Sequence, residues 1–181
     1  MYNSPVIPGY YMAKESFFLR QTLEQTGSGF VQEEIDLGAF VNLATKSGTI
    51  IRILNVELQI TDRDAPMSGP YKTGANLNIG WDLTTTKQTA LVKLSDRSVI
   101  CSGRYEVATD AGGLVDFAQD TRDSMPQHWS NGYLVGVDTI YFQTQADDAS
   151  DGGTYDVSIV LECVSESVSA ANSRALALSQ Q

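Results

Sequence analysis

The chain has 181 residues, of which 42% are hydrophobic and 19% are charged, a size that suits one well-buried domain better than two. Twelve Lys and Arg stand against 22 Asp and Glu, giving a formal net charge of -10, and no basic run occurs anywhere. Because nucleic-acid binding depends on Lys and Arg that displace counterions from phosphates, this balance argues against direct genome contact through a basic arm.

Residues 1–15 are predicted to form an extended N-terminal arm, because two prolines and a glycine interrupt them. The arm lacks the basic start and apolar core of a secretory signal, and no stretch of the chain approaches the roughly 20 apolar residues of a membrane span. Its large apolar side chains argue against a purely solvated tail: Val6, Ile7, Tyr10 and Tyr11.

A β-sandwich domain is predicted over residues 16–164, followed by a C-terminal tail at 165–181 that is Ala-rich and suits a short helix. In the strand expected at 49–61, Ile51 and Ile53 occupy one phase and Val56 and Leu58 the other, which predicts a bulge. Residues 62–74 and 110–130 are predicted to be long loops, the second with a short strand or helix near 114–117. Strands are expected at residues 16–24, 30–37, 49–61, 77–83, 90–94, 98–107, 133–143 and 155–163.

The fold class that follows is all-β. No long helix separates the strands, so parallel crossovers are excluded and the sheets should be antiparallel. About eight strands of this length favour a two-sheet sandwich, most simply a jelly roll. An immunoglobulin-like sandwich competes, but at roughly 100 residues it leaves much of the chain without a place.

Catalytic residues are scarce. A Ser-His-Asp or Cys-His site needs an imidazole, and His128 is the single histidine of the chain. It lies in a predicted loop with no G-x-S-x-G turn to pair with it, so a surface or packing role is favoured. Cupin-type metal centres need several histidines, and structural zinc needs closely spaced cysteines. The sequence therefore predicts no enzyme and no cofactor.

A loop at residues 147–153 concentrates carboxylates beside two glycines. Asp147, Asp148 and Asp151 would supply three of the six to eight oxygens that a calcium ion takes. Asp and Gly are equally what a hairpin turn requires, and the spacing matches no EF-hand. The turn is the favoured interpretation, and calcium binding is the alternative.

The two tryptophans have different predicted roles. Trp81 shares the phase of Leu77 and Leu83 and is expected in the core, whereas Trp129 lies in a loop and is the candidate exposed platform. Such a ring stacks on a sugar or anchors a protein interface, so a carbohydrate-binding, lectin-like module is the alternative function. Cys101 and Cys163 fall in predicted strands, as buried thiols or as a bridge between neighbouring strands.

The sequence pattern resembles that of the small single-jelly-roll capsid proteins of icosahedral viruses. The features that carry the resemblance are a jelly-roll core, an arm that reads MYNSPVIPGYYMAK, long loops at 62–74 and 110–130, and the lack of catalytic residues. The resemblance covers residues 16–164 and is one of pattern. It implies a self-assembling structural protein of the virion, made in the host cytoplasm, whose partners are copies of itself and other shell proteins.

Members of that family commonly carry a basic arm that binds the genome, and this chain departs from them because its arm is nearly uncharged. The departure implies a genome neutralised by other means, such as an internal membrane or separate proteins. Contacts between subunits are expected at the apolar arm residues Val6, Ile7, Tyr10 and Tyr11, and at Leu176 and Leu178 in the tail.

Overall fold

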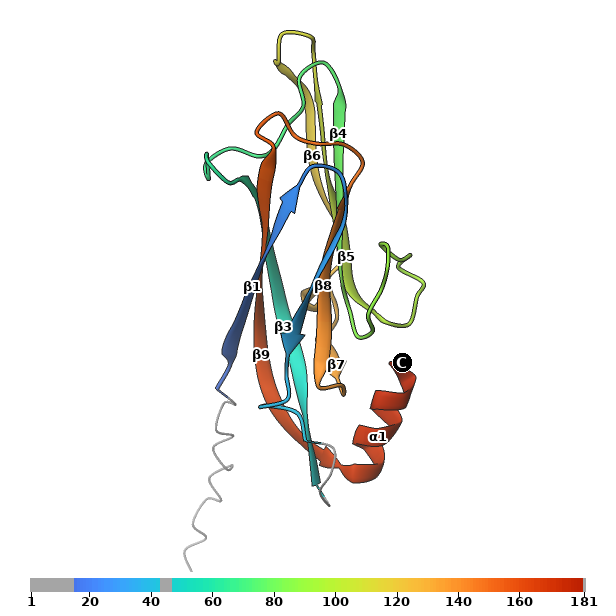
Figure 1. The fold of residues 1–181 in the computed structure, drawn as a ribbon. Helices are drawn as coiled ribbons and strands as arrows, with labels where there is room; N and C mark the ends of the chain where they lie inside the picture. Colours follow the sequence, from blue (N-terminus) through green and yellow to red (C-terminus); the bar gives the residue numbers. More distant parts are fainter. Residues whose placement is uncertain (1–14, 43–46, 181) are drawn as a thin grey trace, which may run out of the picture.

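The computed structural model describes residues 15–42 and 47–180. Long strands dominate these residues, and the chain ends in a short helix (Figure 1). The elements are β1 (Phe17–Thr26), β2 (Gly29–Asp36), β3 (Ser47–Asp62), β4 (Asn76–Thr84), β5 (Val99–Thr109), β6 (Val115–Ser124), the 3-10 helix η1 (Pro126–His128), β7 (Tyr133–Val135), β8 (Thr139–Ala146), β9 (Thr154–Ser169) and α1 (Ala170–Ser179).

The strands form two antiparallel sheets, ordered β1-β9-β3-β7 and β2-β8-β4-β5-β6. Strands from the two ends of the chain pair inward: β1 with β9, β2 with β8, β3 with β7, and β4 with β5. This nesting arises when one long antiparallel hairpin is rolled into a sandwich, and it defines a jelly roll. The predicted all-β, two-sheet antiparallel fold is confirmed, and so is the short C-terminal helix.

Alternation of apolar residues builds the core. In β9, alternate residues from Tyr155 to Cys163 are buried against the opposite sheet, while their neighbours are only partly covered. In β3 the register against β9 shifts between Ile53 and Asn55, which moves the buried phase from Ile51 to Val56. The bulge predicted from the change of phase is therefore confirmed.

Trp81 lies in the core, as predicted, and is the largest of the fully buried side chains in the described ranges. It pairs in register with Gly103 on β5, and a Cβ at Gly103 would lie 2.6 Å from Trp81 Cζ2 and even closer to the Thr121 carbonyl. The indole therefore occupies space that only a glycine on the neighbouring strand leaves open.

Two strand predictions and one loop prediction were wrong. Residues 90–94 form no strand but belong to the loop between β4 and β5, residues 85–98, which we call the strap. Residues 110–130, predicted to be a loop with a short strand or helix near 114–117, contain the ten-residue β6, whose residues are mostly exposed on both faces and so show no alternation. The strand expected at 133–143 is divided at Gly136, because β7 joins one sheet and β8 the other.

Across the described ranges, no helix is long and apolar enough to span a membrane.

Candidate assembly surface

The loop after β6 holds Trp129 in an outward position. Met125 is buried in the core, and η1 follows with Pro126 in its first turn and a hydrogen bond from Trp129 N to Pro126 O (3.0 Å). The Gln127 amide accepts from Val56 N (3.1 Å) and donates to Val56 O (3.0 Å), which occupies the edge of β3 beyond the end of β7. With the loop fixed on both sides, the Trp129 side chain remains 58% exposed.

Trp129 borders a hollow of about 830 Å³ between this loop and the end of the strap. Leu94, on the strap, is 52% exposed at the same hollow. We call it the Trp129 hollow; it is lined by Leu94, Val99, Ile100, Asp123, Ser124, His128, Trp129, Ser130, Asn131, Gly132 and Tyr133. A second depression shares residues 131–133 and continues along β7 to α1. The two form one recessed surface on the outer side of β7.

The C-terminal helix borders this surface and is fixed to the sandwich. Ser169 caps its first turn by accepting from Asn172 N (3.3 Å). Ser173 is fully buried against Gly48, where a Cβ would lie 2.7 Å from its Oγ. Leu176 packs on Gly136, so α1 approaches the sheet at positions without side chains.

Gln180, just after α1, makes the closest attachment. Its amide accepts from Gly136 N (2.9 Å) and donates to Leu134 O (2.5 Å), so it pairs with the outer edge of β7 as a strand residue would. Its backbone carbonyl accepts from Thr85 Oγ1 (2.5 Å), in the residue that follows β4. Gln180 thereby links β7 of one sheet to the start of the segment that leaves β4 of the other.

The predicted interface residues fall in different places. The arm residues lie outside the described residues: Val6, Ile7, Tyr10 and Tyr11. Leu176 is half-buried on its own sheet, while Leu178 is 71% exposed and free to contact another molecule. Trp129 is exposed, as predicted for a platform.

The Trp129 hollow also contains polar side chains. His128 shares it with Ser124, Ser130 and Asp123, and within the described residues no hydrogen bond joins its imidazole to any of them. Asp123 is instead 3.6 Å from the Arg104 guanidinium. Burial raises the pKa of the remaining aromatic hydroxyl, Tyr133, which keeps it neutral.

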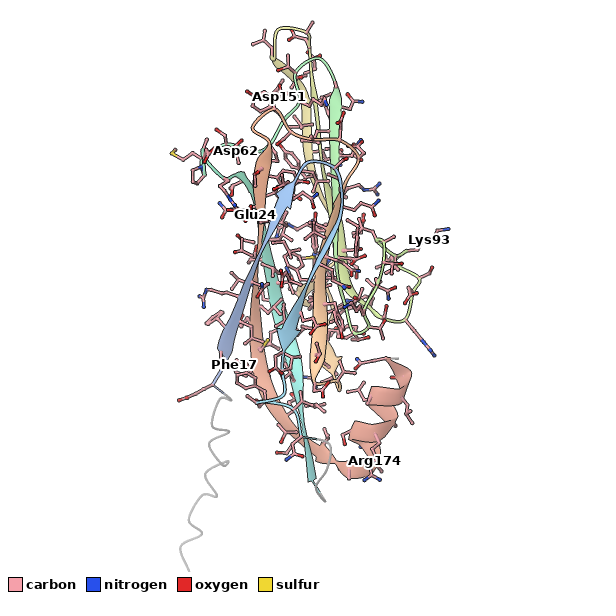
Figure 2. All side chains as sticks on the ribbon, viewed as in Figure 1. Phe17, Glu24, Asp62, Lys93, Asp151 and Arg174 are labelled. Atoms are coloured by element: carbon pink, nitrogen blue, oxygen red, sulfur yellow. The ribbon has the colours of Figure 1, made fainter. Side chains whose placement is uncertain are left out.

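The carboxylates of the acidic loop bind residues 72–78, the segment that leads into β4. Asp147 accepts from Asn78 N (2.9 Å), Asp148 pairs with Lys72 (2.8 Å), and Asp151 accepts from Thr73 N (2.8 Å). Asp151 lies near Asp62 at the end opposite α1 (Figure 2). Among the described residues no three His, Cys, Asp or Glu side chains gather as metal ligands, so calcium binding by Asp147, Asp148 and Asp151 finds no support in the geometry.

Both cysteines are buried free thiols, and no bridge joins Cys101 to Cys163. Burial raises the pKa of Cys163 to about 12 and also raises that of Cys101, so neither forms a thiolate at neutral pH.

Sequence reasoning missed the roles of three polar residues, two beside this surface and one beneath the strap. Gln127 and Gln180 bind strand edges remote in sequence, and no local pattern marks a glutamine for that role. Asp82 occupies the polar phase of β4, which predicts exposure, yet the strap covers it and it is 1% exposed.

Comparisons with known protein families and with curated proteins found no match. Among solved structures, VP1 of Trichodysplasia spinulosa-associated polyomavirus in complex with GM1 oligosaccharide is similar over 90% of this chain and 97% of that chain, with 10% identity and a TM-score of 0.50. The same VP1 with sialylated precision glycooligomers has 10% identity over the same shares and a TM-score of 0.49. Apo New Jersey polyomavirus VP1 has 9% identity over 86% of this chain and 100% of that chain, with a TM-score of 0.48.

These structural neighbours are viral capsid proteins. At 10% identity the likeness establishes the fold, and the strand order independently gives the same jelly roll. What the surface of this sandwich does has to be argued from its own residues.

Proposed function

We propose that this chain is the subunit of a self-assembling shell, a viral capsid protein whose copies pack through sandwich edges and terminal segments. The observation that carries the proposal is the nested strand order of the two sheets, supported by the similarity to a polyomavirus VP1 over 90% of the chain. Jelly rolls occur in both capsid and lectin domains, so the choice between them rests on the surface.

The surface supports an assembly role. Trp129 and Leu94 are each more than half exposed beside an open hollow, although the chain as a whole is strongly acidic. Aromatic anchors beside pockets are typical of interface centres, where a few large side chains carry most of the binding energy. We propose that a neighbouring subunit covers the Trp129 hollow, and that the exposed Leu178 joins the same contact.

The finer features of the proposal concern the chain's ends and its setting. The units are an arm at 1–15, the sandwich at 16–164 and a tail at 165–181. The arm residues Val6, Ile7, Tyr10 and Tyr11 contact other copies. With a net charge of -10, the subunit leaves genome neutralisation to other components of the virion. It is made in the host cytoplasm and has no catalytic role.

Sedimentation velocity of two matched variants tests the contact. Trp129→Asp places a charge at the proposed interface, and Met67→Asp places the same charge on a fully exposed side chain away from the hollow. We expect wild type and Met67→Asp to form large particles, and Trp129→Asp to remain small because a buried unpaired carboxylate opposes the contact. Equal assembly by all three would refute the Trp129 contact.

The carbohydrate-binding alternative rests on the same exposed ring, with Ser130 and Asn131 beside it. Glycan-array binding by monomeric protein that is lost in Trp129→Ala would favour that alternative over the shell.

A further inference from the structure

The strap (residues 85–98) lies across the outer face of the β8-β4-β5 region and is held there by side chains of the strands beneath it. Gln88 N donates to Gln32 Oε1 on β2 (2.9 Å), Leu91 N to Gln145 Oε1 on β8 (3.4 Å), and Val92 N to Asp82 Oδ2 on β4 (3.0 Å). Figure 2 shows Lys93 on the strap, pointing away from the two sheets. The strap thus covers the sheet with few backbone pairings of its own.

Close packing accompanies these hydrogen bonds. Gly80 on β4 has no side chain where a methyl group of Leu91 meets the sheet, and a Cβ there would clash with it. The contact seats the middle of the strap directly over the strand that carries Asp82.

A row of polar residues crosses the sheet beneath the strap. Register partners share one face of a sheet, and five polar side chains fall in one row from β2 to β6. Asp82 and Gln143 are 1% and 0% exposed. The row is Gln32, Gln143, Asp82, Ser102 and Ser124.

This row is incompletely hydrogen-bonded. Within the described residues, Asp82 Oδ1 and both amide atoms of Gln143 have no hydrogen-bond partner, although the two side chains are adjacent in the row. Buried polar atoms without partners are rare and costly, and the cost is greatest for an ionised carboxylate.

The charged groups around Asp82 do not compensate it. Lys93 on the strap and Arg104 and Asp123 on the sheet line a hollow of about 370 Å³ beside the carboxyl. Arg104 is engaged with Asp123, and no cation lies within ion-pair distance of Asp82 among the described residues. The pKa of Asp82 is raised to about 6, mainly by burial; the Val92 N–H and the adjacent Gln143 side chain oppose the rise, and the charge of Asp96 on the strap adds to it.

We propose that the strap is a proton-controlled cover: it stays closed while Asp82 is protonated, and it opens around residues 91–94 when Asp82 is ionised. Leu94 and Asp123 line both the hollow beside Asp82 and the Trp129 hollow, so opening changes the shape of the candidate assembly surface. The motion of the strap stands independently of the proposed shell function, whereas its effect on assembly rests on that function.

The chemistry of the two protonation states gives the direction. A protonated carboxyl still accepts from Val92 N through one oxygen and can donate its proton to the adjacent Gln143 amide oxygen. An ionised carboxyl leaves one oxygen uncompensated, and opening lets water or the Lys93 ammonium reach it. Taking the pKa of about 6 in the closed state and 3.8 in the open state, the ratio of open to closed strap rises roughly fiftyfold between pH 4 and pH 7.

Amide hydrogen exchange measured by NMR tests the motion at the bond itself. The protection factor of Val92 N–H, corrected for intrinsic exchange at each pH, should fall roughly fiftyfold from pH 4 to pH 7. Ser98 N–H is an internal control, because it is held by Asp96 (2.9 Å), whose hydrogen bonds to Ser98 lower its pKa. Its protection should stay constant, as should that of Val92 in Asp82→Asn.

Iodide quenching tests the connection to the Trp129 hollow. Trp81 is buried, so the quenchable tryptophan fluorescence reports Trp129. Quenching should change between pH 4 and pH 7 in wild type and not in Asp82→Asn. If the protection factor of Val92 N–H does not change with pH, or if it falls equally in Asp82→Asn, the proposed opening of the strap is refuted. If the quenching of Trp129 does not change with pH, the coupling between the strap and the Trp129 hollow is refuted. If the protection factor of Val92 N–H falls with pH as expected but the protein forms no particles, the shell function is refuted and the opening of the strap is not.

Discussion

Replacing Gln180 by alanine tests whether the C-terminal helix is an integral part of the sandwich. The wild-type amide pairs with Gly136 N and Leu134 O, and the residue is 4% exposed. Gln180→Ala removes both hydrogen bonds while keeping the backbone carbonyl that accepts from Thr85. The outer edge of β7 then loses two partners at once.

The size of the effect follows from the burial of those groups. A buried backbone group left without a partner costs about 1–3 kcal/mol, so two would cost about 4 kcal/mol in a dry interior. The depression lined by Leu134 and Gln180 is open to solvent, however, so water can replace part of the loss. We therefore expect the free energy of unfolding to fall by about 2 kcal/mol.

Urea unfolding followed by circular dichroism measures this change. With a slope of about 2 kcal/mol per molar urea, the midpoint should move down by about 1 M. Ser179→Ala is the matched control, because its hydroxyl is exposed and bonds only to Leu176 O of the same helix (2.7 Å). If the urea midpoint of Gln180→Ala lies as close to the wild-type midpoint as that of Ser179→Ala does, the conclusion that Gln180 attaches α1 to the sandwich is refuted.

Two further substitutions test the buried interior. Asp82→Asn should raise the free energy of unfolding by up to about 3 kcal/mol at pH 7.5 and leave it unchanged near pH 3.5, because the pKa of Asp82 rises from 3.8 to about 6 on folding. A raised pKa means that its contribution to stability is complete below 3.8 and is lost as the pH passes through about 6; an equal gain for the variant at both pH values would contradict this. Gly103→Ala should cost about 3 kcal/mol in urea unfolding, at the upper end of the usual cost of overpacking, because its Cβ would collide with Trp81 and the Thr121 carbonyl. Gly112→Ala, whose Cβ would meet only the Asp110 side chain (3.3 Å), should change stability far less, and similar losses in both would argue against the packing of Trp81.

The fold was predictable from the sequence wherever one face of a strand is buried and the other is exposed to solvent. β9 and the phase change in β3 show this pattern, because burial on one face forces a period of two. β6 escaped prediction because neither of its faces is buried, so its residues carry no alternation. The β-like residues at 90–94 misled for a different reason: Leu91 and Val92 belong to the strap, whose backbone N–H groups donate to side chains of the sheet and not to a neighbouring strand.

The candidate site was only partly predictable. Trp129 was identified because a large aromatic residue in a loop has no local partner, and it is indeed exposed. Gln180 binds β7 some 44 residues earlier in the chain, and Asp82 is buried by a segment that returns over its own strand. Both environments are created by tertiary packing, and the residue types alone suggest solvent exposure.

Electron microscopy of the purified chain of 181 residues tests the central claim most directly, with samples taken from low to high ionic strength. Because the subunit carries a net charge of -10, screening by salt should favour association. The shell account predicts closed particles of uniform diameter that increase in number with salt. Dispersed single molecules at every ionic strength and at high protein concentration would contradict it.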